Sequence, residues 1–172
     1  MGKKTILIVL AFVMVLATFT YATAGHAPDK GKKDKQVQLG VEGLLSEQKR
    51  LLKGKKVGLI TNPTGVDKEL NSIVDRLHKD SDIELAALYG PEHGVRGDAQ
   101  AGSYVDFYID EDTGLPVYSL YGQTKKPTPE MLKEIDVLVF DIQDVGTRFY
   151  TYIYTMALAM EAAAEQDIPF IV

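Results

Sequence analysis

Short apolar segments that alternate with helix-like segments constrain the fold of this 172-residue chain more than any other feature. The predicted strands are apolar almost throughout, which is typical of strands buried on both faces of a sheet. Apolar strands separated by helices indicate a parallel sheet with helices on both faces. The sequence therefore predicts an α/β fold with strands at residues 56–61, 83–89, 117–121, 137–142 and 168–172.

The helices between the strands are predicted from apolar spacing and from the residues at their ends. Pro129 suits the first turn of a helix, because proline lacks the amide that this turn leaves unpaired. Three tyrosines between Thr147 and Thr155 recur at helical spacing, which is more typical of a buried face than of a ligand site. Another apolar stripe, at i, i+3, i+4 and i+7, consists of Leu70, Ile73, Val74 and Leu77. We expect helices at residues 43–52, 70–77, 129–133 and 150–166.

Residues 1–24 have the organisation of a secretory signal peptide. Two lysines precede an apolar run over residues 6–19, and a small-x-small motif at residues 22–24 suits cleavage. This run is shorter than the roughly 20 residues that a membrane-spanning helix needs. Residues 25–37 are polar and predict a flexible linker. We expect a secreted or cell-wall-associated protein, periplasmic in a two-membrane bacterium, that meets the membrane only transiently during export.

The last predicted strand has no turn signal after it. Parallel strands are joined by crossover connections, most of which contain a helix. We therefore expect residues 38–172 to form a Rossmann-like catalytic domain that is incomplete at its C-terminus and belongs to a longer protein.

Charge and cysteine content exclude several classes of function. Residues 36–172 carry 13 Lys and Arg against 22 Asp and Glu, a net charge of −9. A domain of this charge repels a phosphate backbone, so we expect no nucleic-acid partner. The absence of cysteine excludes disulfides, Cys-ligated zinc, iron–sulfur clusters and a thiol nucleophile. The motifs of P-loop, dinucleotide-binding, serine-hydrolase and zinc-protease sites are also absent, and we expect neither cofactor nor metal.

Polar, glycine-rich segments follow four of the predicted strands. Ligands of open α/β sheets bind beyond the carboxyl ends of the strands, which lie at one edge when the strands are parallel. The sequence therefore predicts one acidic site built from residues 61–65, 90–98, 121–123 and 141–148.

Glu92 and His93 stand between Pro91 and Gly94, which restrict the backbone and aim both side chains. A carboxyl that an apolar strand end shields from water suits a general acid near neutral pH. A structural role is equally open, because Glu92 could cap a helix or pair with Arg96. His93 could simply bond to its neighbours.

A second group of candidates follows the fourth predicted strand. Alternation along the strand places Asp141 and Gln143 on one side and Asp144 on the other. The carboxylates of Asp141 and Asp144, near Glu92, could perform acid–base chemistry, bind sugar hydroxyls or hold a hard cation. Asp144 could instead close an Asx turn. Arg148 could bind a substrate carboxylate in a bidentate fork or neutralise the acidic edge.

A long loop is predicted around residues 104–112. Its aromatic side chains could form a wall on which a sugar stacks, or they could anchor the loop, which is the more common role. These side chains are Tyr104, Phe107 and Tyr108.

Four motifs in order closely resemble a family of bacterial exo-β-N-acetylmuramidases that was long catalogued as a domain of unknown function. They are GPEHGVRG at residues 90–97, TGLPVYSLYG at 113–122, KPTP at 126–129 and DIQDVGTRFYTY at 141–152. The resemblance covers about residue 40 to residue 172. It implies a Rossmann-like domain followed by a smaller α/β domain, with the active site in the cleft between them.

The resemblance further implies release of N-acetylmuramic acid from the non-reducing end of peptidoglycan fragments, so the partners are muropeptides or disaccharides. Glu92 is the position that it assigns as catalytic, and we expect Glu92 to protonate the leaving oxygen. Asp141 or Asp144 is expected as the second catalytic carboxyl. A tyrosine, such as Tyr118 or Tyr121, or the acetamido group of the substrate could take that place.

The expected substrate carries a lactyl carboxylate, so an acidic site needs a cation to bind it. Arg148 and Arg96 are the candidates for that cation. We assign substrate binding to Asn62, His93, Arg96, Tyr121, Gln143 and Arg148.

Two alternative functions stay open. One is a metal-dependent hydrolase with Glu92, His93 and Asp141 as ligands. The other is a cell-wall sugar-binding module without chemistry.

Overall fold

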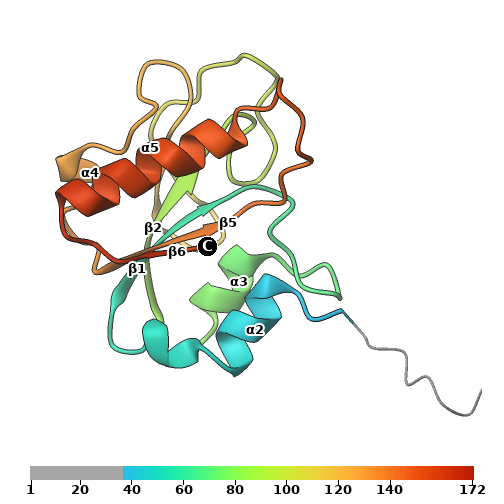
Figure 1. Ribbon diagram of the computed structural model, residues 1–172, viewed down its shortest axis with the longest axis vertical. Coiled ribbons are helices and arrows are strands. Elements are labelled where there is room, and N and C mark those ends of the chain that lie inside the picture. The colour runs from blue at the N-terminus through green and yellow to red at the C-terminus, as the bar shows by residue number, and fades with distance from the viewer. Residues whose placement is uncertain (1–36) are drawn as a thin grey trace, which may run out of the picture. The chain divides into compact units, whose positions relative to one another are not determined.

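A six-stranded sheet forms the centre of the computed structural model, which describes residues 37–172. The strands lie in the order β3-β4-β2-β1-β5-β6. Their bounds are β1 Lys56–Thr61, β2 Glu84–Gly90, β3 Tyr108–Ile109, β4 Pro116–Ser119, β5 Val137–Asp141 and β6 Phe170–Ile171. The helices are α2 Gly40–Ser46, the 3-10 helix η1 Lys49–Leu51, α3 Ile73–His78, α4 Pro129–Leu132 and α5 Tyr152–Glu165. Helices α4 and α5 cover one face of the sheet, and α2 and α3 cover the other (Figure 1).

Five of the six strands run parallel, and β3 pairs antiparallel with β4 at one edge. The predicted α/β fold with helices on both faces is confirmed, but the sheet is mixed rather than purely parallel. The difference arises within the predicted long loop, where Tyr108 lies opposite Val117. A strand of two residues is too short to produce a periodic pattern in the sequence.

The order of the strands reverses at β1. The chain adds β2 and β4 on one side of β1 and then crosses over to add β5 and β6 on the other side. In open α/β sheets, ligands bind at this reversal, beyond the carboxyl ends of the strands that flank it. Thr61 lies opposite Asp141 in the register of β1 and β5. The segments that follow these two residues therefore occupy the usual ligand-binding position of such a sheet.

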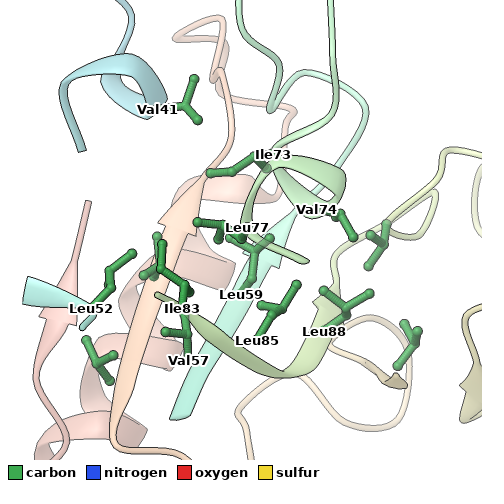
Figure 2. Close-up of a cluster of buried hydrophobic side chains, with 14 residues drawn as sticks. Val41, Leu52, Val57, Leu59, Ile73, Val74, Leu77, Ile83, Leu85 and Leu88 are labelled. Carbon is green, nitrogen blue, oxygen red and sulfur yellow. The ribbon is translucent and has the colours of Figure 1, made fainter. Parts of the chain in front are cut away.

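Each face of the sheet has its own hydrophobic core, and successive residues of β5 alternate between the two cores. Val137 and Val139 belong to the cluster on the α3 side. Figure 2 shows this cluster, with Val57 and Leu59 of β1 beside residues of α3. Leu138 and Phe140 pack on the opposite side, against the alanines of α5. Because side chains alternate along a strand, the direction of the next residue, Asp141, follows from this pattern.

Helices α4 and α5 match their predicted bounds within two residues, whereas the other two predicted helices differ by more. The segment at residues 43–52 forms α2 and then η1, because the Ser46 hydroxyl donates a 2.6 Å hydrogen bond to the Glu42 carbonyl at the end of α2. Helix α3 begins three residues later than predicted, since the Ser72 hydroxyl caps it by accepting a hydrogen bond from the Val74 amide. The prediction that Leu70 belongs to the buried stripe is wrong: its φ is +63° and it is 78% exposed.

The aromatic face of α5 points away from the sheet. Tyr150 and Tyr154 are 45% and 68% exposed, so the prediction that the tyrosine spacing marks a buried face is wrong. Small side chains form the buried face instead, which lets the helix approach the sheet closely. They are Thr155, Ala159, Ala162 and Ala163.

The predicted signal peptide and nearly all of the predicted linker lie outside the described residues. Within residues 37–172, no helix combines the length and apolar character that a bilayer-crossing segment requires. Helix α4 begins at Pro129 as predicted, with the Thr128 hydroxyl accepting a hydrogen bond from the Met131 amide.

We predict that Gly65→Ala destabilises the fold by about 1–3 kcal/mol, as overpacking of a tight site does. A Cβ atom at position 65 would press on Thr61 Oγ1 and lie 2.9 Å from the carbonyl oxygen of Asp141, where β1 and β5 end. Gly40→Ala is the control, because a Cβ there meets no atom within 4 Å. Urea unfolding measures both free energies, and equal stability of the two variants would contradict the prediction.

Candidate functional site

The carboxyl ends of β1, β2, β4 and β5 lie at one edge of the sheet. The registers place Thr61 opposite Asp141, and Gly90 opposite Ser119. The four polar segments predicted to converge therefore start side by side. That part of the prediction is confirmed.

The candidate carboxyls at this edge lie on opposite faces of the sheet. Asp141 continues the alternation of Val137 and Val139 and lines a cavity of about 350 Å³ with residues of α2 and α3. Glu92 lies on the α5 side, where its carboxylate contacts Thr151 directly before α5. The structure therefore does not bring Glu92 and Asp141 into one hollow.

The Glu92 carboxylate is surrounded by hydrogen-bond donors. Its Oε1 atom accepts a hydrogen bond of 3.2 Å from the Gly102 amide, and its Oε2 atom accepts one of 3.4 Å from the Thr151 hydroxyl. The interaction of the Tyr121 hydroxyl with the Glu92 carboxylate, together with desolvation, raises the pKa of Tyr121. Glu92 thus bonds neither Arg96 nor a backbone amide of α5 among the described residues, so neither predicted structural role is observed.

A strained turn presents Glu92. The Gly94 amide donates a 2.9 Å hydrogen bond to the Pro91 carbonyl, which closes the turn around Glu92 and His93. His93 has a φ of +73°, a left-handed conformation that costs a non-glycine residue roughly 1–2 kcal/mol. Its Nδ1 atom lies 3.1 Å from the Ala99 carbonyl oxygen. His93 therefore supports the loop through this contact, while it also lines the hollow described next.

Aromatic residues form the other side of a hollow of about 240 Å³ that contains Glu92. The rings of Tyr150 and Tyr152 lie edge to face with centroids 5.8 Å apart. A second hollow, of about 470 Å³, contains Tyr121 and shares Thr151 with the first. The lining of the smaller hollow is Glu92, His93, Phe149, Tyr150, Thr151 and Tyr152.

Asn62 and Gln143 close loops at the reversal between β1 and β5. Asn62 is buried, and its Oδ1 atom accepts hydrogen bonds from the amide and the hydroxyl of Thr64, at 3.0 and 2.6 Å. The Gln143 amide donates to the same Thr64 hydroxyl at 2.8 Å, and its side chain donates to the Asp144 carbonyl. These bonds give both residues a role in joining the two loops, in addition to the substrate binding predicted for them.

Asp141 and Asp144 each have one buried side-chain oxygen, Oδ2, without a hydrogen-bond partner among the described residues. Burial raises the pKa of the Asp141 carboxyl. The Oδ1 atom of Asp144 accepts a 2.6 Å hydrogen bond from the Gly146 amide. This bond forms the Asx turn that the sequence offered as an alternative role for Asp144. Strand β5 ends at Asp141, so the predicted alternation of Gln143 and Asp144 does not apply.

The two candidate arginines differ in whether the chain's own carboxylates already bind them. The Nε, Nη1 and Nη2 atoms of Arg96 all bond carboxylates of this chain, so the structure places Arg96 in an internal ion-pair network rather than at a substrate-binding position. Arg148 is exposed, precedes Phe149 of the hollow and forms no ion pair within residues 37–172. Arg148 is therefore the better placed of the two to bind a substrate carboxylate.

Sequence reasoning missed the aromatic wall and Thr151. The tyrosines of the wall were missed because their helical spacing was taken to indicate burial, although Tyr150 is 45% exposed. Phe149, which is 92% exposed, was not part of that argument. Thr151 lies in the motif at residues 141–152 that the sequence had already singled out, and this is the signal that could have found it. Gly102 contributes only its backbone amide, so no side-chain pattern could have revealed it.

The arrangement suits acid–base chemistry on a ligand with both polar and apolar surfaces, such as a sugar. A carboxyl held by a hydroxyl and a backbone amide can exchange a proton with a ligand, and the neighbouring rings offer apolar faces. Within residues 37–172, no three His, Asp or Glu side chains are grouped closely enough to hold a metal ion. The three residues considered as metal ligands do not lie together, because Asp141 is on the opposite face of the sheet from Glu92 and His93.

Comparison with known proteins gives a family and one curated relative. The family model described as "Exo-beta-N-acetylmuramidase NamZ, N-terminal" matches residues 57–172. The peptidoglycan β-N-acetylmuramidase NamZ of Bacillus subtilis (strain 168) is 61% identical over 171 residues, which is 99% of this chain and 41% of that protein. The chain thus spans less than half the length of this relative.

Two solved structures are similar to the chain, both of DUF1343-family proteins from Bacteroides fragilis. One has a TM-score of 0.70 at 60% identity, and the other has a TM-score of 0.62 at 35% identity. Each match covers 77% of this chain and 33% of the other. The α/β architecture described above therefore recurs in relatives that are considerably longer.

We predict that Glu92→Gln moves the pKa of Tyr121 back towards its ordinary value. The substitution removes the carboxylate whose hydrogen bond and charge raise that pKa. NMR titration of the tyrosine ring carbons measures the change. Glu130→Gln, in exposed α4, is the control with no expected effect. An unchanged Tyr121 titration in Glu92→Gln would contradict the assigned contact.

Proposed function

Because the chain belongs to the family of exo-β-N-acetylmuramidase NamZ N-terminal domains, we propose that it supplies the acid–base carboxyl of a peptidoglycan glycosidase. The reaction is release of N-acetylmuramic acid from the non-reducing end of peptidoglycan fragments, and the partners are muropeptides or disaccharides. The observation that carries this proposal is the placement of Glu92 in an aromatic hollow at the carboxyl edge of the sheet.

Glu92 acts as the general acid. Its protonated carboxyl donates a proton to the glycosidic oxygen as the bond from that oxygen to the anomeric carbon breaks. The second catalytic group forms a bond to that carbon, and a water molecule then replaces it, giving its proton to Glu92. As a carboxylate, Glu92 keeps its hydrogen bonds from Thr151 and Gly102. Positioned proton transfer of this kind contributes typically about 10²–10⁴-fold to a rate. The aromatic wall holds the sugar by its apolar faces while the proton moves.

The second catalytic group is Tyr121 or the acetamido group of the substrate. Glycosidases with two carboxyls keep them about 5–5.5 Å or 6.5–9.5 Å apart on either side of the sugar, and some families use a tyrosine or the substrate's acetamido group instead. Asp141 faces the opposite side of the sheet, and Asp144 has one carboxylate oxygen in an Asx turn and the other buried away from solvent. Tyr121 lines the hollow that adjoins that of Glu92 through Thr151, on the α5 side of the sheet, which supports its choice over Asp141.

Arg148 binds the lactyl carboxylate that distinguishes N-acetylmuramic acid from N-acetylglucosamine. Arginine matches a carboxylate through two parallel hydrogen bonds. Arg148 is exposed beside the hollow, whereas Arg96 is saturated by internal carboxylates. This assignment gives the site a means of discriminating between the two amino sugars.

The protein acts outside the cytoplasm, in the cell wall or, in a two-membrane bacterium, in the periplasm. The charged start, apolar run and cleavage motif of residues 1–24 support export. Peptidoglycan, on which the Bacillus relative acts according to its name, lies in the same compartment.

We predict that Glu92→Gln in the intact protein lowers kcat on a chromogenic N-acetylmuraminide by about 10²–10⁴-fold, because the amide cannot donate the catalytic proton. Product release is followed spectrophotometrically, and Glu111→Gln, an exposed carboxyl near β3, is the control. Equal turnover of wild type and Glu92→Gln would contradict the assignment.

Two further readouts separate the alternative functions. Loss of wild-type activity after EDTA treatment, with recovery on adding metal, would favour a metal-dependent hydrolase. Sugar binding without turnover by the wild-type protein would favour a binding module.

We predict that Arg148→Gln raises KM for the muraminide by roughly 10–100-fold and leaves kcat nearly unchanged, since a charge-assisted hydrogen bond contributes about 1.5–3 kcal/mol. Arg50→Gln, on η1, is the matched control. Inhibition by free N-acetylmuramic acid should weaken in Arg148→Gln, while that by N-acetylglucosamine should not. An unchanged KM in Arg148→Gln would contradict the assignment of Arg148 to substrate binding.

A further inference from the structure

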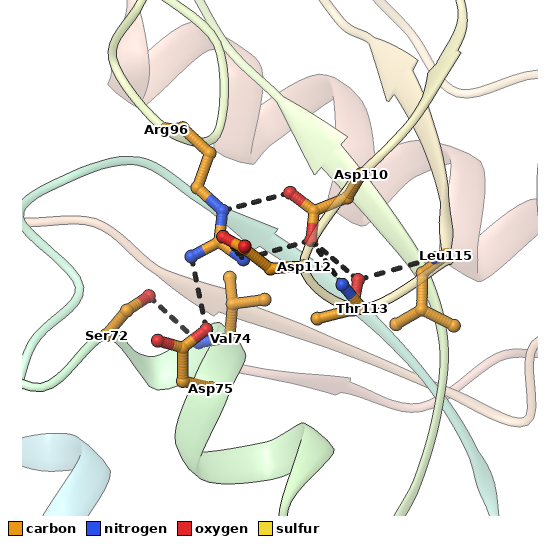
Figure 3. Close-up of polar contacts among 8 residues, drawn as sticks. All are labelled: Ser72, Val74, Asp75, Arg96, Asp110, Asp112, Thr113 and Leu115. Atoms are coloured by element: carbon orange, nitrogen blue, oxygen red, sulfur yellow. Dashed lines mark hydrogen bonds and ion pairs between the residues drawn. The ribbon is translucent and has the colours of Figure 1, made fainter.

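The loop that carries Glu92 is anchored on both faces of the sheet. Glu92, near its start, contacts Thr151 on the α5 side. Arg96, four residues later, reaches the other side, where it bonds Asp75 of α3 and Asp110 directly after β3 (Figure 3). The two side chains thus connect one loop to structural elements on both faces.

The contact between Arg96 and Asp110 is bidentate and largely buried. The Nε and Nη2 atoms of Arg96 donate to the two carboxylate oxygens of Asp110 at 3.0 and 2.9 Å. Asp110 is 3% exposed and accepts two more hydrogen bonds from the amide and hydroxyl of Thr113, at 3.1 and 2.6 Å. The bond from Arg96 holds the pKa of the Asp110 carboxyl below its usual range, so the pair is charged at neutral pH.

Loop 91–97 forms no helix or strand, and one hydrogen bond, from the Gly94 amide to the Pro91 carbonyl, closes its first turn. His93, Gly94 and Gly97 all have positive φ angles. Gly97 packs so closely on Pro63 that a Cβ atom would collide with the proline ring. Val95 is buried among the residues of the α3-side core and supplies the apolar anchor of the loop.

The contacts on the α3 side therefore determine where the loop lies. Arg96 forms a two-point contact with a buried acceptor that is itself fixed by Thr113, which restricts both the position and the rotation of the guanidinium. The bond to Asp75, at 3.2 Å, is single and joins a more exposed carboxylate. The Asp110 contact is the stronger of the two constraints.

We propose that the Arg96–Asp110 ion pair is a positioning device for Glu92: it fixes loop 91–97 so that the carboxyl projects into the aromatic hollow. This inference rests on the proposed function of Glu92 as the general acid. Arg96 is then a positioning residue that acts through Glu92 and touches no substrate.

The test is a kinetic comparison of Arg96→Lys and Asp110→Asn in the intact protein, with the muraminide as substrate. Lysine keeps the charge but loses the two-point contact, and asparagine keeps the shape of Asp110 but loses its charge. A misplacement of about 1 Å costs up to roughly 10²-fold, so we expect kcat to fall by about 10–100-fold while KM stays within about twofold. Lys126→Gln, which breaks surface ion pairs to α5, is the control with wild-type kcat.

A double-substitution cycle separates positioning from general stability. In a Glu92→Gln background, Arg96→Lys should cause no further loss of the residual rate, because the group that it positions is already absent. A loss of the same size in both backgrounds would overturn the proposal, as would wild-type kcat in both single variants. If neither variant folds, Thr113→Val, which removes only the hydroxyl that donates to Asp110, takes their place: a lower kcat at constant KM supports the proposal, and an unchanged kcat overturns it.

The same measurements distinguish a failure of the proposed function of Glu92 from a failure of the positioning role of the ion pair. Full activity of Glu92→Gln would overturn the proposed function itself. An inactive Glu92→Gln together with fully active Arg96→Lys and Asp110→Asn would overturn only the positioning role.

Discussion

Parallel pairing of β1 with β5 is the interaction on which the rest of the structure depends. It places Thr61 opposite Asp141, and the Thr61 hydroxyl donates a 2.8 Å hydrogen bond to the Asp141 carbonyl. The pairing creates the reversal of strand order that defines a ligand-binding edge in such sheets. The alternation of side chains then divides that edge, with Asp141 facing α2 and α3 and the loop after β2 carrying Glu92 to the α5 side.

Most of the fold could be predicted because burial on both faces leaves a strong pattern in the sequence. The strand at residues 56–61 matches β1, and the strand predicted at 83–89 is displaced by one residue from β2. The predictions failed where local interactions override apolar spacing. Ser72 starts α3 after Leu70, and α5 packs through its alanines rather than through its tyrosines.

The candidate site could be predicted only in part. Glu92, His93 and Tyr121 were found because turn residues and strand ends indicate where loops gather, and the structure brings these three together. The sequence could not show on which face a loop side chain lies after its strand has ended, so Asp141 was grouped with Glu92. Arg96 was predicted to bind substrate because its acidic partners are distant in sequence: Asp75 and Asp110 meet it only in the folded chain.

The most direct test of the account is to locate the bound sugar by NMR. Titration of the isotopically labelled intact protein with N-acetylmuramic acid should shift the resonances of Glu92 and Thr151 in the aromatic hollow and of Tyr121 in the adjoining one. Shifts confined to the cavity beside α2 and α3, at residues such as Ile73 and Asp141, would contradict it. That result would move the sugar to the other face of the sheet and leave Glu92 without a role in the reaction.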